Sequence, residues 1–409
     1  MPSKSKKPRT KAKPELPVLS AKEARTFLVG HHGLRAIEHP RGAAGVRAVL
    51  QKLRCIQLDP LEPLGQNADL VALARVDGIR IGDVYAHSYP GHAFEHWAKE
   101  RCLLPASAFP WYRAESQAGA SVHTSWWWQH KRIERLPAGV VERVLEEVRE
   151  RGPLTAKDLA HHGDVERLNW SGWKSSARAG SMALDVLWTN CQLVVCGRTS
   201  SGKLFDLPER AMPKFSTAAP KGEPDAQGKF PRWALLQRVD AAGLLSRAQG
   251  ATWSTLSQVR KTGLADTLVE EGVLEEVLVE GSPRPYLARR GFRERTFPKD
   301  DGRLRILGPL DPLVWDRPLV KDAFGFDYAW EVYKPAHQRR WGWYVVPLLH
   351  RGELVGRMEG AIEKDAVRIK KLWGEPGKKL DLDALQAALQ RHAEAAGVGK
   401  VVVTRRVRK

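Results

Sequence analysis

The chain has 409 residues, of which 43% are hydrophobic and 28% are charged, and its formal net charge is +19. This length is too great for one core and predicts two to four domains in a globular protein. The sequence lacks an apolar run long enough to cross a membrane and the apolar core of a secretory signal, so we expect a cytoplasmic protein.

Positive charge is concentrated at the two ends of the chain. Residues 1–14 contain six Lys or Arg and residues 400–409 contain five, without an acidic residue in either stretch. These eleven charges leave about +8 for the remainder, which is still basic. The balance predicts binding to a polyanion, first of all nucleic acid, although for the N-terminal stretch alone we favour a role in solubility or nonspecific binding.

The four cysteines, Cys55, Cys102, Cys191 and Cys196, are too few and too scattered for a disulfide framework. Cys191 and Cys196 lack a second pair at metal-ligand spacing. We therefore expect small, buried, apolar side chains, and we predict no structural zinc, no other metal and no cofactor.

The N-terminal part of the chain has the pattern of short helices behind a basic arm. Residues 1–17 are charged and Pro-rich, which favours a disordered tail. Ser20 followed by Glu23 is a capping box that begins a helix. Further helices are expected at 44–53 and 70–76. Helices separated by short turns are typical of helix-turn-helix modules.

The same pattern returns in the next part of the chain. Residues 140–149 have the spacing of an amphipathic helix, a turn capped by Thr155 begins a second helix, and residues 181–190 form a third. Two apolar runs on either side of a Gly/Ser turn then predict a β-hairpin. Three helices and a hairpin make a winged helix, in which Arg198 and Lys203 flank the hairpin tip and would contact phosphate.

A third and weaker copy of the pattern runs from Trp233 to about Arg290, with a helix at 234–241 and a hairpin near Gly281. These copies are repeats of a structural unit and not of sequence. Residues 214–229, which are rich in Pro, Gly and Ala, favour a linker before the third copy.

After residue 300 the pattern changes to strands. A hairpin is expected from 341–349 and 354–359, with further strands at 367–373 and 401–403 and an amphipathic helix at 382–395. This composition favours a small, mostly β domain.

We therefore predict an α+β protein of tandem winged-helix domains, three in number, with a C-terminal small β-barrel-like domain. The predicted boundaries are a disordered basic tail at 1–17, winged helix one with the catalytic element at 18–135, winged helix two at 136–213, a linker at 214–229, winged helix three at 230–299, and the C-terminal domain at 300–409.

The most informative short motif is Ile56-Gln57-Leu58-Asp59-Pro60. In an extended segment alternate side chains share a face, so Gln57 and Asp59 would point the same way while Leu58 enters the core. A carboxylate beside an amide can hold and polarise one water, which on a DNA-binding surface suggests hydrolysis. Taken locally, the same pair is more often part of a turn, since Asp before Pro favours turns.

Four stretches along the chain share the order and spacing of one family: residues 53–59, 94–97 with 103–105, 204–210, and a long stretch through 310–317, 324–328, 339–344 and 355–357. Over about residues 19–375 the chain resembles the crosslink-repair DNA glycosylases of the YcaQ and AlkZ type. Asp59 matches the YcaQ-like branch, whereas the AlkZ-like branch has Gln there. Leu310, where the family usually has Phe, and Pro60 and Pro63 depart from the pattern and bear on substrate range.

The resemblance implies hydrolysis of the N-glycosidic bond of N7-alkylated guanine, interstrand crosslinks included. Such a base is cationic and leaves neutral, so the harder tasks are to stabilise an oxocarbenium-like sugar and to align a water. Asp59 would do both, and Gln57 would fix the water or the sugar. No lysine lies in this element, which predicts a monofunctional glycosylase that leaves an abasic site.

Several other residues have two readings each. Glu95 would either approach the same cleft or form a structural ion pair. His92 and His96 have the spacing of a metal pair on a helix, but no third ligand stands out.

Three basic clusters are candidates for DNA contact. His337, Arg339 and Arg340 beside Trp341 would grip phosphate or probe the minor groove, or would form a solvated turn. Lys131 and Arg132 would contact phosphate. The nearby run Trp126-Trp127-Trp128 would stack on bases or, more in keeping with its context, pack between helices.

The expected partner is double-stranded DNA with alkylated or crosslinked bases, bound by a monomer in the cytoplasm in association with the nucleoid. The alternative is a non-enzymatic multi-winged-helix DNA-binding protein, a regulator or an architectural protein, because the fold alone does not choose between them. Release of N7-methylguanine from methylated DNA would discriminate.

Overall fold

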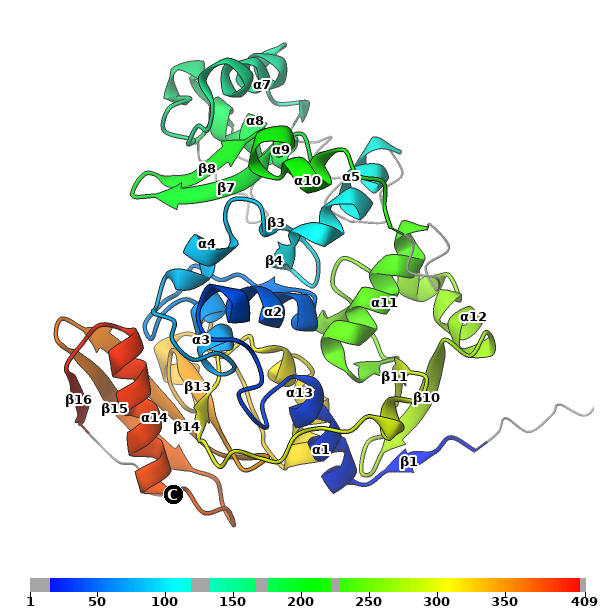
Figure 1. Cartoon of the computed structure of the whole chain (residues 1–409), viewed down its shortest axis with the longest axis vertical. Coiled ribbons are helices and arrows are strands. Elements are labelled where there is room, and N and C mark those ends of the chain that lie inside the picture. Colours follow the sequence, from blue (N-terminus) through cyan, green and yellow to red (C-terminus); the bar gives the residue numbers. More distant parts are fainter. Residues whose placement is uncertain (1–14, 119–132, 167–175, 222–228, 405–409) are drawn as a thin grey trace, which may run out of the picture.

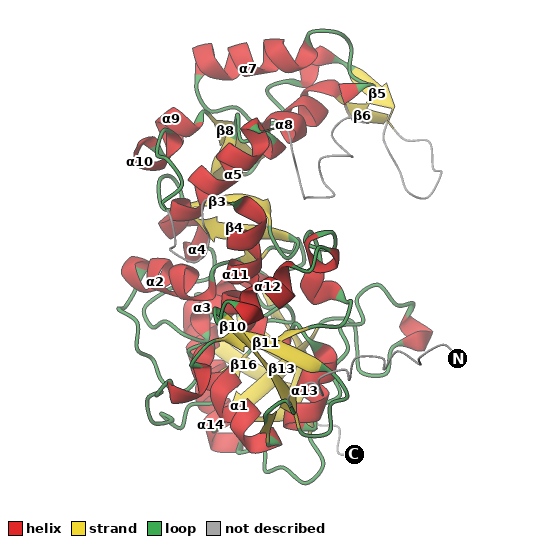
Figure 2. Cartoon of the chain, turned by 90° about the vertical axis from the view of Figure 1, so that its right-hand side faces the viewer, coloured by secondary structure: helices red, strands yellow, loops and turns green. Residues whose placement is uncertain are grey.

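The structure, a computed structural model, describes residues 15–118, 133–166, 176–221 and 229–404. Over these residues helices alternate with small β-sheets, so the chain has the mixed α+β fold that the sequence predicted (Figure 1, Figure 2). Within the described ranges, no helix combines the length and apolar character needed to cross a membrane.

The first helix, α1 (Ala21–His31), begins at the predicted capping box. Ser20 Oγ accepts a hydrogen bond from the Glu23 N–H at 3.2 Å, and the Glu23 carboxylate accepts one from the Ser20 N–H at 2.8 Å. The preceding strand β1 (Val18–Leu19) pairs in parallel with the distant strand β10 (Leu274–Val279). The N-terminal segment therefore extends a sheet from the third predicted copy, although the sequence analysis grouped it with the helices that directly follow.

Residues 43–105 form a group of elements that we call unit one. In chain order they are α2 (Ala43–Leu53), β2 (Ile56–Gln57), α3 (Asn67–Leu73), α4 (Asp83–Ser88), β3 (Ala93–Trp97) and β4 (Arg101–Pro105). Apolar side chains three and four apart along α2 are buried, namely Val46, Val49, Leu50 and Leu53. Strand β4 lies between β2 and β3 in an antiparallel sheet, so the short strand that carries Gln57 is held by the hairpin.

Unit two, residues 140–206, lies at the top of Figure 1 and, like unit one, begins with a helix and ends with a helix and a hairpin. Its elements are α7 (Val140–Arg151), β5 (Asp164–Glu166), β6 (Ser176–Arg178), α8 (Ala179–Thr189), β7 (Val194–Thr199) and β8 (Gly202–Asp206). A bridge between Leu154 and Phe205 takes the place of the short strand β2. The predicted β-hairpin is confirmed as β7 and β8.

The helix that was predicted to begin at Thr155 is not formed. Asp158 Oδ2 accepts hydrogen bonds from the Thr155 N–H at 2.8 Å and from its hydroxyl at 2.7 Å, and these close a tight turn. A 3-10 turn, Ala160–His162, follows and ends at Gly163, whose φ of 79° lies in the left-handed region. The Asp side chain satisfies the backbone locally, which is why the segment turns in place of continuing as a helix.

Short helices connect the units. Helix α5 (Phe109–Gln117) leads out of unit one, and α9 (Pro208–Ala211) and α10 (Pro213–Ser216) lead out of unit two. Helix α10 overlaps the start of the predicted linker at 214–229, of which residues 222–228 lie outside the described part of the chain.

Unit three, residues 230–289, has the order of unit one with a single α-helix between the short strand and the hairpin. Its elements are α11 (Phe230–Ala242), β9 (Leu245–Ser246), α12 (Leu264–Glu270), β10 (Leu274–Val279) and β11 (Pro285–Arg289). Strand β11 lies between β9 and β10, as β4 lies between β2 and β3 in unit one, and β1 is added at the outer edge of β10.

The C-terminal part is built on a five-stranded sheet with the order β12, β13, β14, β15, β16. The elements are β12 (Arg305–Ile306), α13 (Arg317–Phe324), β13 (Val345–His350), β14 (Glu353–Glu363), β15 (Ala366–Gly374), α14 (Leu382–Ala395) and β16 (Lys400–Val403). The edge strands β12 and β16 do not pair with each other within the described residues, so the sheet is a half-barrel. Helix α14 covers it with Leu385, Ala388, Leu389 and Ala393.

The strand predicted to begin at residue 341 begins instead at Val345. The Glu331 carboxylate accepts a hydrogen bond from the Trp341 N–H at 2.8 Å, and Glu359 Oε1 accepts one from the Trp343 N–H at 2.7 Å. Because carboxylates take these N–H groups, they are not available to a strand ladder.

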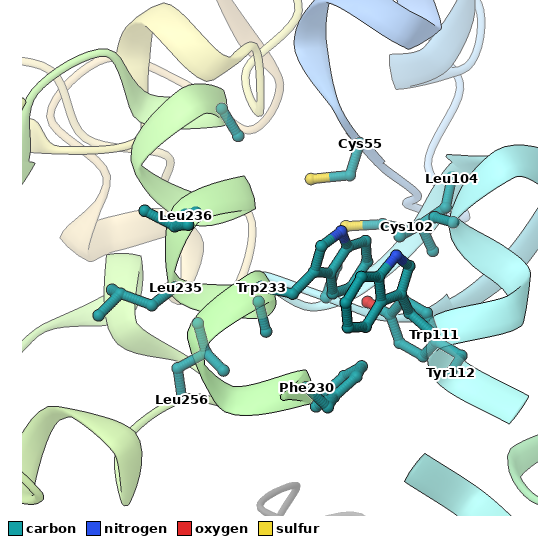
Figure 3. Close-up of a cluster of buried hydrophobic side chains, with 14 of the residues drawn as sticks. Cys55, Cys102, Leu104, Trp111, Tyr112, Phe230, Trp233, Leu235, Leu236 and Leu256 are labelled. Atoms are coloured by element: carbon teal, nitrogen blue, oxygen red, sulfur yellow. The ribbon is translucent and has the colours of Figure 1, made fainter. Parts of the chain in front are cut away.

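Units one and three share an apolar core, drawn in Figure 3. The rings of Trp111 and Trp233 stack at 5.2 Å between centroids and 8° between planes. Cys55 and Cys102 lie at the edge of this cluster, and all four cysteines are free thiols. The reading of the cysteines as small core residues is confirmed for Cys55, Cys102 and Cys191, while Cys196 is half-buried.

Candidate functional site

Gln57 and Asp59 lie where unit one, unit three and the C-terminal sheet meet. Gln57 is the last residue of β2 and is opposite Cys102 of β4. The pairing continues for one more residue, because the Leu58 N–H donates to the Arg101 carbonyl at 2.9 Å. The chain then leaves the sheet at Asp59, which is followed by the exposed Pro60. The motif is therefore the end of a strand held by a hairpin.

The Gln57 side chain is 9% exposed and is bound on its acceptor side. Its Oε1 accepts a hydrogen bond from Lys99 Nζ at 2.9 Å. Its backbone carbonyl accepts one from Asn67 Nδ2 at 2.8 Å. The side-chain amide of Gln57 is thus held by the β3–β4 hairpin, and its backbone is held by α3.

The Asp59 carboxylate is half-buried and lightly bound. Its Oδ1 accepts a hydrogen bond from the Leu61 N–H at 2.9 Å, so the turn expected for Asp before Pro is formed. Burial raises the pKa of Asp59, and the Leu61 hydrogen bond opposes the rise. Among the described residues no cation lies within ion-pair distance of this carboxylate and its second oxygen accepts no hydrogen bond. That oxygen is left for a water or a substrate atom.

Tyr344, immediately before β13, faces Asp59 from the C-terminal sheet. The Tyr344 side chain is buried, and burial, together with the negative charge of Asp59, raises the pKa of its hydroxyl. Among the described residues the hydroxyl has no hydrogen-bond partner. A buried hydroxyl without a partner beside a catalytic candidate is a group on which a bound substrate or water would act.

Lys99 is the residue of this site that the sequence analysis missed. It lies at the tip of the β3–β4 hairpin, is 6% exposed, and stands 5.4 Å from the centroid of the Trp315 ring. Burial lowers its pKa to about 8. Residues 56–60 contain no lysine, but Lys99, which is remote in the sequence, reaches this segment in the fold. The signal that finds Lys99 is the pairing of β2 with β4, which brings the hairpin tip to Gln57.

The segment 308–315 packs against the site through Asn67. Asn67, fully buried in α3, donates to the Gln57 carbonyl and accepts a hydrogen bond from the Leu310 N–H at 3.1 Å. A side chain at Gly308 would place its Cβ 2.5 Å from Asn67 Oδ1, so the close approach requires glycine.

A buried ion pair anchors this segment. Arg75 Nη1 and Nη2 donate to the two oxygens of Asp311 at 2.7 and 2.9 Å, and both side chains are fully buried. Arg75 also donates to the His32 carbonyl at 2.7 Å and to the Val71 carbonyl at 2.8 Å. The pair is bidentate, and each nitrogen of the guanidinium donates at least one hydrogen bond, as a buried ion pair requires.

Of the two roles considered for Glu95, the structure shows the ion pair. Its fully buried carboxylate is contacted by the Arg101 guanidinium at 3.3 Å, by Lys203 Nζ at 2.6 Å, by Arg198 and by the Tyr89 hydroxyl at 3.1 Å. Burial alone raises the pKa of Glu95, but the three cations outweigh burial and the pKa ends below its usual value. Glu95 therefore joins β3 of unit one to the β7–β8 hairpin of unit two.

The same cluster changes the picture of Arg198 and Lys203, which were predicted to meet phosphate at a hairpin tip. Both side chains turn back onto Glu95, and the Arg198 guanidinium also lies 4.0 Å from the centroid of the Tyr85 ring. Contact with DNA stays a prediction for these two residues, and it would require them to leave a buried carboxylate.

The second basic cluster lies on an exposed loop that leads into Tyr344. His337 is in a 3-10 turn, Arg339 Nε donates to the Lys334 carbonyl at 2.7 Å, and Arg340 pairs with Asp327 at 3.1 Å at the surface. The Tyr333 side chain on the same loop is 83% exposed. The loop thus presents cations and an exposed aromatic ring in the segment that leads into Tyr344. The third cluster, Lys131 and Arg132 with the tryptophans at 126–128, lies outside the described residues.

His92 and His96 do not lie on one helix, because residues 93–97 form a strand, so the spacing of a helical metal pair does not apply. His96 is buried against the Thr189 carbonyl at 3.1 Å, whereas His92 is exposed. A different group of possible ligands forms in unit two, where the Nε2 atoms of His161 and His162 lie 3.1 and 2.6 Å from Glu147 Oε1. These contacts are also ordinary hydrogen bonds, and they account for the arrangement.

The residues of the site lie in the part of the chain that a protein-family model matches. The model of the family described as DNA glycosylase AlkZ-like matches residues 50–395, from within α2 to the last residue of α14. The chain belongs to the AlkZ-like DNA glycosylase family. Among solved structures, the DNA glycosylase AlkZ of Streptomyces sahachiroi has the same fold, with a TM-score of 0.60 and 19% identity over 95% of this chain and 100% of that chain.

For an AlkZ-like DNA glycosylase the substrate is DNA, and its process is DNA repair. Membership favours the enzyme over a non-enzymatic DNA-binding protein. The match includes Gln57, Asp59 and Lys99, as well as the basic loop around His337.

Proposed function

We propose that this AlkZ-like DNA glycosylase hydrolyses the N-glycosidic bond of alkylated purines, with N7-alkylguanine as substrate and water as nucleophile. It leaves an abasic site and an unbroken strand. The observation that carries the proposal is the Asp59 carboxylate, which is half-buried and has a raised pKa, one oxygen bound to the backbone and, among the described residues, no cationic partner.

The chemistry of the substrate fits a lone carboxylate. An N7-alkylguanine is cationic and departs as a neutral base, so positive charge moves to the sugar as the bond breaks. A negative charge at the edge of the protein interior interacts with that developing charge more strongly than it would in water. The raised pKa of Asp59 also makes the carboxylate a better proton acceptor for the attacking water.

Gln57 supports Asp59 without adding charge. Its amide is held two residues earlier, at the end of the same strand. A neutral amide can orient a water or the sugar beside a cationic transition state, whereas a second carboxylate there would compete for the proton.

We interpret units one to three as winged helices. The support is the order that they share, a helix, a short strand or bridge, further helical turns, and a hairpin whose last strand takes the middle of the sheet in units one and three. Their boundaries at 18–135, 136–213 and 230–299 and the monomeric state stay predictions. His337, Arg339 and Arg340 are the phosphate contacts of this proposal, because their loop leads directly to Tyr344 at the site.

The test is release of N7-methylguanine from methylated duplex DNA by the full chain under single-turnover conditions. The wild type releases the base and leaves heat-labile abasic sites without strand breaks. Asp59→Asn abolishes most of the release, whereas Glu62→Gln, an exposed carboxyl three residues away that accepts from Gln66 Nε2, does not. A duplex crosslinked through two N7 atoms is the second substrate, because the same bond is broken.

Full release by Asp59→Asn would contradict the assignment of Asp59. Absence of release by the wild type from any alkylated duplex, with DNA binding retained, would favour the non-enzymatic alternative. Strand breaks that form at the same rate as base release would indicate that the nucleophile is an amine and not water.

A further inference from the structure

We infer that Lys99 is a positioning residue of the glycosylase site. It turns the Gln57 amide so that the N–H donors of the amide face the reacting sugar and water. The positive charge of Lys99 opposes the reaction until Lys99 loses its proton. The inference rests on the proposed function of Asp59 and Gln57. It adds a residue, a direction for the amide and a dependence on pH.

The direction of the amide follows from the hydrogen bond between Lys99 and Gln57. A lysine ammonium is a donor only, so the atom of Gln57 at 2.9 Å from Lys99 Nζ is the carbonyl Oε1. The NH₂ group of Gln57 therefore points away from Lys99. A water that attacks the sugar must accept one hydrogen bond to be oriented and must give a proton to a base. Gln57 offers the donor and Asp59 offers the acceptor, and an amide turned the other way would duplicate Asp59.

Lys99 is itself held in place by unit three. The Thr255 hydroxyl donates to the Ala98 carbonyl, and the Ser254 hydroxyl donates to Glu100 Oε1 at 2.6 Å. These contacts hold the residues on each side of Lys99 at the hairpin tip. With the Trp315 ring on another side, the position of the ammonium is determined by three separate parts of the chain.

The groups around Lys99 do little to stabilise its positive charge. The charged or titratable groups that face it are Cys102 of β4, Glu100 of the hairpin tip, Arg238 of α11 and Arg317 of α13. Glu100 lies within reach of Ser254, and among the described residues no carboxylate is within ion-pair distance of Lys99. Burial therefore lowers the pKa of Lys99 to about 8, and the two arginines act in the same direction.

The sign of the pH effect follows from the charges. Below its pKa Lys99 is positive and repels both a cationic N7-alkylguanine and the positive charge that develops on the sugar. Above its pKa Lys99 is neutral and still donates a hydrogen bond to Gln57. Excision is therefore expected to rise a second time as the pH passes about 8, beyond the rise that accompanies ionisation of Asp59.

The test compares pH profiles of single-turnover excision of N7-methylguanine from duplex DNA for the wild type, Lys99→Arg and Lys99→Met. Arg donates a hydrogen bond but keeps its proton, so Lys99→Arg loses the alkaline rise. Met removes both functions, so Lys99→Met loses the rise and is also slower by about tenfold near neutral pH. Spontaneous release without enzyme is subtracted at each pH.

Lys203→Met is the matched control. Lys203 is also a partly buried lysine with a pKa lowered to about 8 by burial, but it lies against Glu95. The alkaline rise persists in Lys203→Met, whatever its absolute rate, if Lys99 is the group that titrates. Loss of the rise in Lys203→Met with its retention in Lys99→Arg would overturn the inference.

A double-mutant comparison separates positioning from a general structural effect. If Lys99 acts through Gln57, Lys99→Met slows wild type but has little further effect in a Gln57→Ala background. Equal effects in both backgrounds would overturn the positioning role, and thermal unfolding identifies a variant that has lost its fold. Wild-type excision that depends on Asp59 with unchanged profiles for both Lys99 variants rejects this inference alone, whereas absence of wild-type excision at every pH rejects the proposed function.

Discussion

Two carboxylates of unit one, Asp59 and Glu95, lie one strand apart and have opposite surroundings. Glu95 is fully buried and is contacted by two arginines, one lysine and a tyrosine hydroxyl, so its pKa is lowered. Asp59 is half-buried, is bound by one backbone N–H, and has a raised pKa. A carboxylate whose oxygens are saturated by cations cannot accept a proton from water at neutral pH, whereas one that lacks partners can. The difference separates a structural acid, Glu95, from Asp59, the acid that we propose to be catalytic, within the same small sheet.

The largest effect that tests this comparison is on activity. Asp59→Asn is expected to lower the single-turnover rate of N7-methylguanine excision by a factor of about 10²–10⁴, the usual contribution of a positioned base. Because the fold disfavours the charged form of Asp59, the same change leaves the melting temperature unaltered or slightly raised. A variant that is inactive because it has melted would not bear on the comparison.

A third carboxylate, Asp311, extends the comparison to a fully buried carboxylate with one cationic partner, Arg75. Arg75→Met leaves the Asp311 charge buried without its bidentate partner and is expected to lower the free energy of unfolding by about 3–5 kcal/mol. Chemical denaturation measures the loss. The double variant Arg75→Met with Asp311→Leu should recover much of it, and a double variant no more stable than the single one would show that packing and not charge is at fault.

Glu95→Gln is expected to have a smaller effect, on stability and on the attachment of unit two. The amide keeps the bond to Tyr89 but leaves three cations without their negative partner. The cost is about 2 kcal/mol, the lower end for such a loss, because the cations can reach water. Urea unfolding and limited proteolysis of unit two provide the measurement. A Glu95→Gln variant that is fully stable but as inactive as Asp59→Asn would move Glu95 into the active site.

The pKa values of Asp59 and Glu95 are shifted in opposite directions, so the two carboxylates respond differently to acid. The raised pKa of Asp59 means that excision begins to fall above its ordinary value of 3.8, and protonation of Asp59 does not destabilise the fold. The lowered pKa of Glu95 means that its stabilisation is complete above its ordinary value of 4.5 and is lost only as the pH falls through the lower pKa. As the pH falls, excision activity is therefore lost before the circular-dichroism signal of the folded protein. Coincident losses would remove the distinction.

The smallest expected effect is at the basic loop. Arg339→Ala, and separately Arg340→Ala, should weaken DNA binding and reduce the slope of log affinity against log salt by about 1 for each phosphate contact removed. The rate of excision at saturating enzyme should change little. Titrations at several salt concentrations provide the slopes, and an unchanged slope for both variants would assign the loop to a solvated turn.

Elements whose hydrogen bonds are local could be predicted from the sequence. The capping box of Ser20 and Glu23 and the hairpin formed by β7 and β8 were predicted because each depends on residues a few positions apart. The turn at Thr155 shows the limit of such reasoning. A Thr cap and a Thr–Asp turn use the same residue types, and the competition between them is decided by small local differences in energy.

The sequence by itself indicated the family through the order and spacing of motifs along most of the chain. It indicated the α+β class and the candidate pair Gln57 and Asp59 through periodicity and a motif that lie within short segments. The tertiary structure alone decided that Lys99 lies on Gln57, that Arg198 and Lys203 turn onto Glu95, and that β1 joins the sheet of unit three. These contacts depend on strand register and on how the units pack, which are properties of pairs far apart in the chain. Partners that far apart lower the pKa of Glu95, whereas burial raises the pKa of Asp59 against the hydrogen bond from Leu61. The motif that carries Asp59 is local in the sequence, but its burial comes from the tertiary structure.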